Sequence, residues 1–239
     1  MLPSRRSWRT SPVINRLKIF LTRFRLARWL ASLKNGTMKM LRHGYQPRQF
    51  WDEWAERFSQ HPYQQALHES NLWLLDRLRE ARPTEILEVG CGFGRNIKMI
   101  QQHLGYECLM TGIDLSTRLL AKARRDLGIT CPLVCGDITR LPFPDRSFET
   151  VFTHGVMMHV PPEGVRASVR ELVRVTRRTL WCIEEQVLTR RARSKSFSIN
   201  DYTFAHDYPA LFAELGIRPA RTDYQGKVVA LILMRVDLA

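Results

Sequence analysis

The sequence of 239 residues has no run of about eighteen uninterrupted apolar residues, the length that a membrane-spanning helix needs. Its five cysteines are an odd number and include no C-x-x-C pair. This cysteine usage predicts reduced thiols rather than a disulfide framework or a zinc site. The amino end lacks the apolar core of a secretory signal. From these absences we expect a cytoplasmic protein without a bound metal.

Acidic side chains are missing from the first 48 positions, which hold twelve Lys or Arg and no Asp or Glu. The rest of the chain carries 25 basic and 23 acidic side chains, so most of the formal charge of +14 belongs to this arm. We predict two parts: a basic helical arm over residues 1–44 and an α/β domain over residues 45–239. Because that domain is close to neutral, its charge does not favour nucleic-acid binding.

Residues 12–34 of the arm have helical spacing, with two apolar stripes separated by basic side chains. Three interpretations fit this pattern. The helix packs on the domain, makes peripheral contact with anionic lipid, or serves as a mitochondrial transit segment. The three alternatives differ in localisation, from cytoplasmic to membrane-associated to mitochondrial.

The stretch from Thr84 to Arg95 predicts a strand, a glycine loop and the start of a helix. The apolar run Ile86–Val89 leads into Gly90, Gly92 and Gly94. A chain that leaves a buried parallel strand must turn sharply and let its backbone approach a ligand, and glycine does both because it has no Cβ. The spacing is one residue shorter than the dinucleotide fingerprint G-x-G-x-x-G. We therefore expect a ligand site at this loop.

Strand-like and helical segments alternate after the loop, which is typical of a parallel sheet covered by helices. The sequence predicts strands over residues 86–89, 108–114, 132–135, 148–153, 179–184, 222–225 and 228–235. The last two flank a glycine and are predicted to pair antiparallel. The expected fold class is α/β, a doubly wound and mostly parallel seven-stranded sheet with a terminal antiparallel hairpin, plus the basic arm.

The loop resembles the first motif of the class I S-adenosylmethionine-dependent methyltransferase family, E-x-G-x-G-x-G, in the run Glu88-Val89-Gly90-Cys91-Gly92-Phe93-Gly94. The resemblance covers about residues 84–185 and implies a Rossmann-like methyltransferase fold with S-adenosylmethionine as cofactor. It also implies that helices over residues 45–80 cap the cofactor pocket, although their aromatic stripe is expected mainly to pack. The sequence departs from the family at residues 176–179, where a glycine-containing turn is usual.

The resemblance further implies which residues hold the cofactor. Asp114 would accept hydrogen bonds from the ribose hydroxyls, Asp137 would accept one from the adenine amino group, and Glu88 would lie near the methionine end. The expected cofactor-binding residues are Glu88, Gly90, Cys91, Gly92, Asp114, Leu115, Asp137, Ile138 and His154, and no metal ligand is expected. Any one of the acids alone could instead be a solvated turn residue or a helix cap.

Methyl transfer to a hydroxyl or an acidic N–H benefits from a base. His159 and His206 are the candidate catalytic residues, and each has a structural alternative as a hydrogen-bonded ring. Glu184 and Glu185 could also face the substrate. The chain lacks the motif (Asn/Asp)-Pro-Pro-(Tyr/Phe) of related enzymes that methylate nucleic-acid amino groups. We therefore expect a small or lipid-linked acceptor. The alternatives are an RNA methyltransferase that uses the arm and a catalytically silent assembly partner.

Overall fold

The computed structural model describes residues 45–187, 197–200, 202–218, 221–225 and 229–237. The chain separates into two units, Met1–Gln46 and Pro47–Ala239, and every described helix and strand belongs to the second. The predicted arm over residues 1–44, with its proposed lipid-binding segment, lies outside the described residues.

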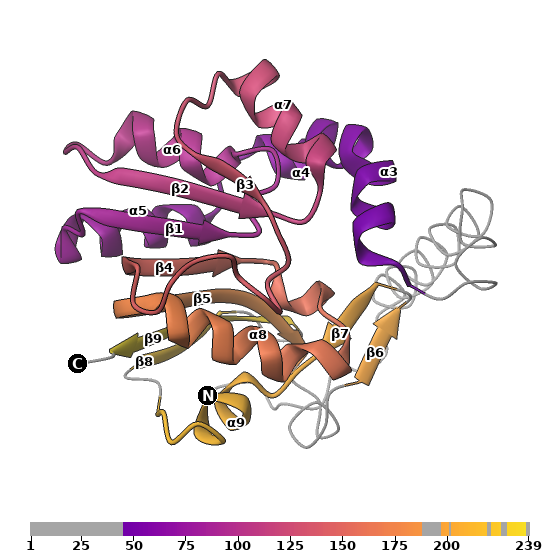
Figure 1. Cartoon of the computed structure of the whole chain (residues 1–239), viewed down its shortest axis with the longest axis vertical. Coiled ribbons are helices and arrows are strands. Elements are labelled where there is room, and N and C mark those ends of the chain that lie inside the picture. Colours follow the sequence, from indigo (N-terminus) through magenta and orange to yellow (C-terminus); the bar gives the residue numbers. More distant parts are fainter. Residues whose placement is uncertain (1–44, 188–196, 201, 219–220, 226–228, 238–239) are drawn as a thin grey trace, which may run out of the picture. The chain divides into compact units, whose positions relative to one another are not determined.

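A seven-stranded sheet in the order β3-β2-β1-β4-β5-β9-β8 is the centre of the second unit (Figure 1). Its strands are β1 (Glu85–Val89), β2 (Leu109–Asp114), β3 (Leu133–Cys135), β4 (Phe148–His154), β5 (Thr176–Val187), β8 (Arg221–Gln225) and β9 (Val229–Asp237). Strands β1 to β5 pair parallel, whereas β9 pairs antiparallel with both β5 and β8. The predicted α/β class and parallel sheet are confirmed, with the parallel pairing confined to the first five strands and the hairpin antiparallel.

Helices cover both faces of this sheet (Figure 1). They are α3 (Pro47–Gln60), α4 (Pro62–Gln65), α5 (Glu69–Ala81), α6 (Arg95–His103), α7 (Thr117–Leu127), α8 (Pro162–Val175) and α9 (Tyr208–Ala213), with a 3-10 turn η2 (Met157–His159). Successive side chains of a strand point to opposite faces. In β1, Ile86 packs in the core formed with α5, α6 and α7, whereas Leu87 and Val89 pack with α8 and α9.

Two features of the fold differ from the sequence expectation. Helix α8 ends at Val175 and β5 begins at Thr176, so no turn residue separates them. The Thr176 hydroxyl donates to the Leu172 carbonyl at 2.6 Å, which ends the helix without the usual glycine. A two-stranded sheet of β6 (Phe197–Asn200) and β7 (Thr203–Ala205) was not expected.

Within the described ranges, no helix combines the length and the apolarity that crossing a membrane requires.

Candidate active site

The glycine loop joins β1 to α6 at the carboxyl edge of the parallel strands. Gly90, Gly92 and Gly94 all have positive φ, of 77°, 55° and 85°. The backbone N–H of Gly90 donates to the carbonyl of Ile113 in β2 at 2.7 Å. A Cβ on Gly90 would lie 2.3 Å from a methyl carbon of Val156, so this position requires glycine for space as well as for conformation.

Asp114 ends β2 and fixes the loop. Its Oδ2 accepts from the N–H of Gly92 at 2.8 Å, and its Oδ1 accepts from the N–H of Ser116 at 2.8 Å. Burial raises the pKa of Asp114 to about 6, and the backbone N–H donors oppose that rise. The carboxylate is therefore ionised at neutral pH. Since each carboxylate oxygen has two lone pairs, it can still accept from a ligand's hydroxyls.

Glu88 lies at the end of β1 and is 1% exposed. Its Oε1 accepts from the amide of Asn96 at 2.7 Å, and Asn96 in turn accepts from Asn71 at 2.8 Å. Its Oε2 is buried and has no hydrogen-bond partner among the described residues. Burial raises the pKa of Glu88 to about 8. An unpaired buried acid oxygen is costly, and it fits a ligand that brings a cation or a donor.

The amide pair behind Glu88 was missed by sequence reasoning. Asn71 occupies a position in the apolar stripe of α5, and Asn96 lies in the first turn of α6; both are buried. A polar residue at a core-facing helical position was the available signal, since buried polar groups nearly always have a partner.

His154 ends β4 on the α5 side of the loop. Its Nε2 lies 3.1 Å from the hydroxyl of Ser70, whereas its Nδ1 is buried without a partner among the described residues. Burial, followed by the positive charge of Arg95, lowers the pKa of His154 to about 3, so the ring is neutral. Arg95 also buries a guanidinium nitrogen that has no acceptor in the described part of the chain. Around one end of the loop, polar atoms of Glu88, Arg95 and His154 are thus without hydrogen-bond partners from the described residues.

The other expected cofactor residues have plainer surroundings. Asp137 is exposed, and its Oδ1 accepts from both the N–H and the hydroxyl of Thr139 at 2.8 Å, which is an Asx turn. Ile138 is half-buried against the α8 core, and Leu115 is half-buried next to Asp114. Cys91 belongs to the glycine loop, and its side chain is buried against Gly112 of β2.

Helix α3 covers this edge of the sheet. The Asp52 carboxylate accepts from the Ser116 hydroxyl at 2.6 Å and from the Arg118 N–H at 3.1 Å, so α3 is tied to the start of α7. Phe58 lies over the glycine loop, with its ring 6.1 Å from that of Phe93. The aromatic stripe therefore packs, as expected, and it packs on the loop itself.

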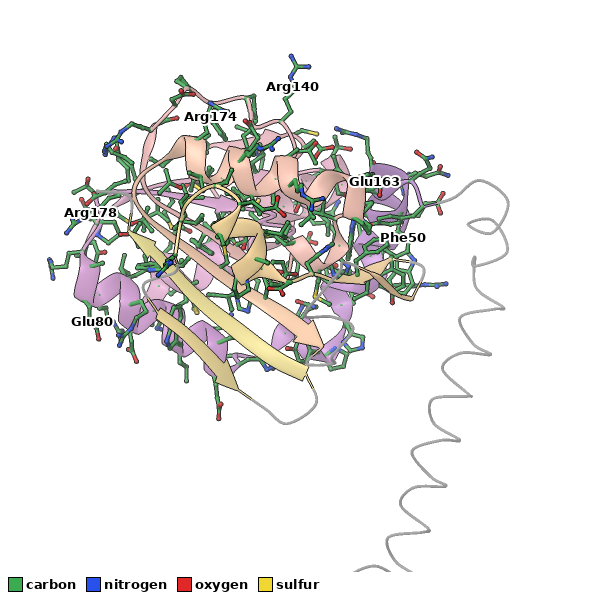
Figure 2. All side chains as sticks on the ribbon, turned by 90° about the horizontal axis from the view of Figure 1, so that it is seen from below. Phe50, Glu80, Arg140, Glu163, Arg174 and Arg178 are labelled. Atoms are coloured by element: carbon green, nitrogen blue, oxygen red, sulfur yellow. The ribbon has the colours of Figure 1, made fainter. Side chains whose placement is uncertain are left out.

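His159 lies in an aromatic cluster formed by three separate parts of the chain. Its ring meets that of Trp51 edge-on, with the ring centroids 4.8 Å apart, and stacks with that of Tyr202, with the centroids 6.0 Å apart. Tyr202 also stacks with Phe50 at the start of α3, with ring centroids 4.7 Å apart. Phe50 is labelled in Figure 2. The Nδ1 of His159 lies 2.8 Å from the Tyr202 carbonyl, which can only accept, so Nδ1 carries the proton and Nε2 the lone pair. Burial lowers the pKa of His159 to about 4.

The structure places His206 and Glu184 in the interior, where each makes hydrogen bonds to the backbone. His206 is fully buried, and its Nε2–H donates to the Val160 carbonyl at 2.9 Å. Glu184 is fully buried as well, and its carboxylate accepts from the N–H groups of Val156 and Met157, both at 3.0 Å. Both side chains thus make hydrogen bonds to the turn that follows β4. Nothing is described of the Glu185 side chain. Among the described residues, no three His, Cys, Asp or Glu group as metal ligands would.

A glycine loop fixed by an acid from the next strand, at the carboxyl edge of an open parallel sheet, is the arrangement typical of nucleotide-binding α/β proteins. Residues 86–179 match the family model described as a methyltransferase domain. This match over residues 86–179 agrees with the resemblance of the glycine loop to the class I S-adenosylmethionine-dependent methyltransferase family. The cofactor of that family is S-adenosylmethionine.

Two curated relatives and one solved structure illustrate the similarity. A 2-methyl-6-phytyl-1,4-hydroquinone methyltransferase of Synechocystis sp. is 31% identical over 39% of this chain and 29% of its own. A malonyl-[acyl-carrier protein] O-methyltransferase of Halorhodospira halophila is 33% identical over 43% of this chain and 35% of its own. This chain therefore spans about a third of their length or less. The magnesium protoporphyrin IX methyltransferase of Synechocystis, solved with S-adenosylmethionine bound, has a TM-score of 0.58 at 16% identity, covering 81% of this chain and 98% of that one.

Proposed function

We propose that this protein transfers a methyl group from S-adenosylmethionine to a hydroxyl or an amine of a small or lipid-linked acceptor. One observation carries the proposal: beside the glycine loop, Glu88 buries an acid oxygen without a partner among the described residues, while Asp114 fixes the loop backbone. A ligand with a cationic amino-acid end and a ribose diol would satisfy both acids.

In this proposal the chain holds the cofactor from both ends. Asp114 would accept the ribose hydroxyls, Asp137 and Ile138 would border the adenine, and Glu88 would meet the ammonium group. When bound, S-adenosylmethionine supplies a methyl group activated by its sulfonium. The protein's contribution is then alignment and exclusion of water, and α3 with its aromatic side chains closes the edge of the sheet for that purpose.

His159 is the residue we propose as the base. Its Nδ1–H is used by the Tyr202 carbonyl, so the neutral ring keeps its lone pair on Nε2, where a proton from a hydroxyl or an amine would be accepted. The aromatic rings around it favour an acceptor with apolar surface. The names of the relatives, which include a phytyl-hydroquinone and an acyl-carrier-protein enzyme, support the same class of acceptor.

Replacing Asp114 with alanine tests cofactor binding. We expect isothermal titration to show a loss of affinity for S-adenosylmethionine of about 10- to 100-fold, because hydrogen bonds to a charged group contribute about 1.5–3 kcal/mol. Asp126→Ala is the control, since it removes an exposed acid of α7 whose partners are Lys122 and Arg125. Wild-type protein that does not bind, or Asp114→Ala that binds as well as wild type, would reject the proposal.

Labelled-methyl transfer from S-adenosylmethionine into a host extract separates the proposal from its alternatives. We expect label in the small-molecule or lipid fraction. Label in RNA that disappears when residues 1–48 are deleted would instead support the RNA methyltransferase. Cofactor binding without transfer to any fraction would support the silent assembly partner.

A further inference from the structure

The turn that follows β4, residues Val156–Val160, touches both halves of the candidate site. The side chain of Val156 occupies the space beside Gly90 where a Cβ would otherwise lie. Three residues later, His159 enters the aromatic cluster and donates to Tyr202. The turn consists of η2 and one residue on each side of it. The position of the His159 ring relative to the glycine loop therefore depends on how firmly this short segment is held.

Glu184 holds the first half of the turn. The N–H groups at the start of a helical turn have no partner inside it, and buried ones must find an acceptor elsewhere. The Glu184 carboxylate reaches across from β5 and accepts from Val156 and from Met157, both at 3.0 Å. Burial raises the pKa of Glu184 to about 7, although these donors oppose the rise. Hydrogen bonds to a carboxylate are stronger than those to a neutral acceptor, so they hold the backbone more firmly.

His206 holds the second half of the turn. Its ring is fully buried, with ring centroids 6.3 Å from Phe204 and 5.8 Å from Tyr208. From this fixed position its Nε2–H donates to the carbonyl of Val160, the residue that directly follows His159. Burial lowers the pKa of His206 to about 4, so this ring stays a neutral donor.

We propose that Glu184 and His206 are positioning residues that hold the Val156–Val160 turn, and so set the tautomer and orientation of His159. The proposal rests on the proposed function, in which His159 is the base. It assigns to both side chains a task that acts through the turn and needs no contact with either reactant. Misplacing a reacting group by about 1 Å can cost about 100-fold in rate, so a loosened turn would reduce transfer even with the cofactor bound.

The test reads the His159 ring directly, by long-range 1H–15N spectra of protein labelled in its histidines. In the wild type we expect the Nδ1–H tautomer for His159. In Glu184→Gln and in His206→Ala we expect the ring to move toward the Nε2–H form, which predominates for histidine in water. His206→Gln keeps an N–H donor and should restore much of the wild-type signature. Labelled-methyl transfer should fall about 100-fold in the first two variants, with affinity for S-adenosylmethionine within about threefold.

Glu149→Gln is the matched control. Its carboxylate also accepts from a backbone N–H, that of Thr84 at 2.8 Å, but it starts from the amino end of β4 and does not touch the turn. It should leave the His159 spectrum unchanged. An unchanged His159 tautomer in a folded Glu184→Gln or His206→Ala protein would overturn the proposal. Should one of these variants not fold, the other decides. Failure of the wild type to bind S-adenosylmethionine would reject the proposed function without altering the tautomer result.

Discussion

Replacing Gly90 with alanine is expected to lower the free energy of unfolding by about 2–5 kcal/mol, through left-handed strain and overpacking together. The new Cβ would lie 2.3 and 2.6 Å from the two methyl carbons of Val156, and the backbone has a φ of 77°. Val156 cannot withdraw freely, because its N–H is held by the buried Glu184. We therefore expect the glycine loop to give way, and S-adenosylmethionine binding to fall below detection by isothermal titration.

Gly105 supplies the control for this substitution. Its φ is 84°, close to that of Gly90, but a Cβ there would meet nothing within 4 Å. Gly105→Ala thus carries the conformational strain alone, and we expect a loss of about 1–2 kcal/mol with cofactor affinity unchanged. Urea denaturation of both variants measures the difference. Equal losses in the two would mean that the contact with Val156 contributes nothing, and intact cofactor binding in Gly90→Ala would show that the loop tolerates the displacement.

Much of the sheet could be predicted from the sequence because its signals are local. Each of β1 to β4 is a short apolar run with a turn signal at its end, and the glycine loop is a contiguous motif. The family assignment followed from that motif. The boundary between α8 and β5 could not be placed, because the usual glycine is replaced by a threonine that caps the helix with its own hydroxyl. Strands β6 and β7 were not predicted either, because they span only four and three residues, too few for a pattern to stand out.

The roles of the buried polar residues could not be predicted, for a physical reason. The partners of Glu184 are 27 and 28 positions away, and the partner of His206 is 46 positions away. Nothing in local spacing distinguishes an acid that caps a distant turn from one that faces a substrate. By contrast, Asp114 and Glu88 could be proposed as ligands because they stand at the ends of adjacent parallel strands, where any fold of this class brings them together.

Glu88 makes the stability of the protein depend on pH in a direction opposite to that of an ordinary paired carboxylate. Burial raises its pKa from 4.5 to about 8, so the folded state holds a proton that the unfolded state releases. The stability that this group contributes is fully present below about pH 4.5 and is lost as the pH rises through about 8. At 1.36 kcal/mol for each pKa unit, the loss by pH 8.5 is on the order of 5 kcal/mol. The pKa values of Glu184 and Asp114 are also raised, to about 7 and about 6, so these two groups add to the loss of stability with rising pH, and their contribution ends at a lower pH than that of Glu88.

Glu88→Gln isolates the contribution of that one group. The amide does not titrate, so thermal unfolding between pH 5 and pH 8.5 should show a shallower decline in the variant, and the variant should be the more stable protein at pH 8.5. Glu149→Gln is the control. Burial alone would raise the pKa of Glu149, but hydrogen bonds from Thr84 and Arg178 lower it, so this substitution should leave the slope of stability between pH 5 and pH 8.5 as in the wild type.

Because the sulfonium cofactor is cationic, its binding favours ionised Glu88. Affinity in the wild type should therefore rise with pH toward about 8, with protons released on binding, whereas Glu88→Gln should bind more weakly and with less dependence on pH. A wild-type affinity that is flat over this range would mean that Glu88 does not meet the cofactor's charge.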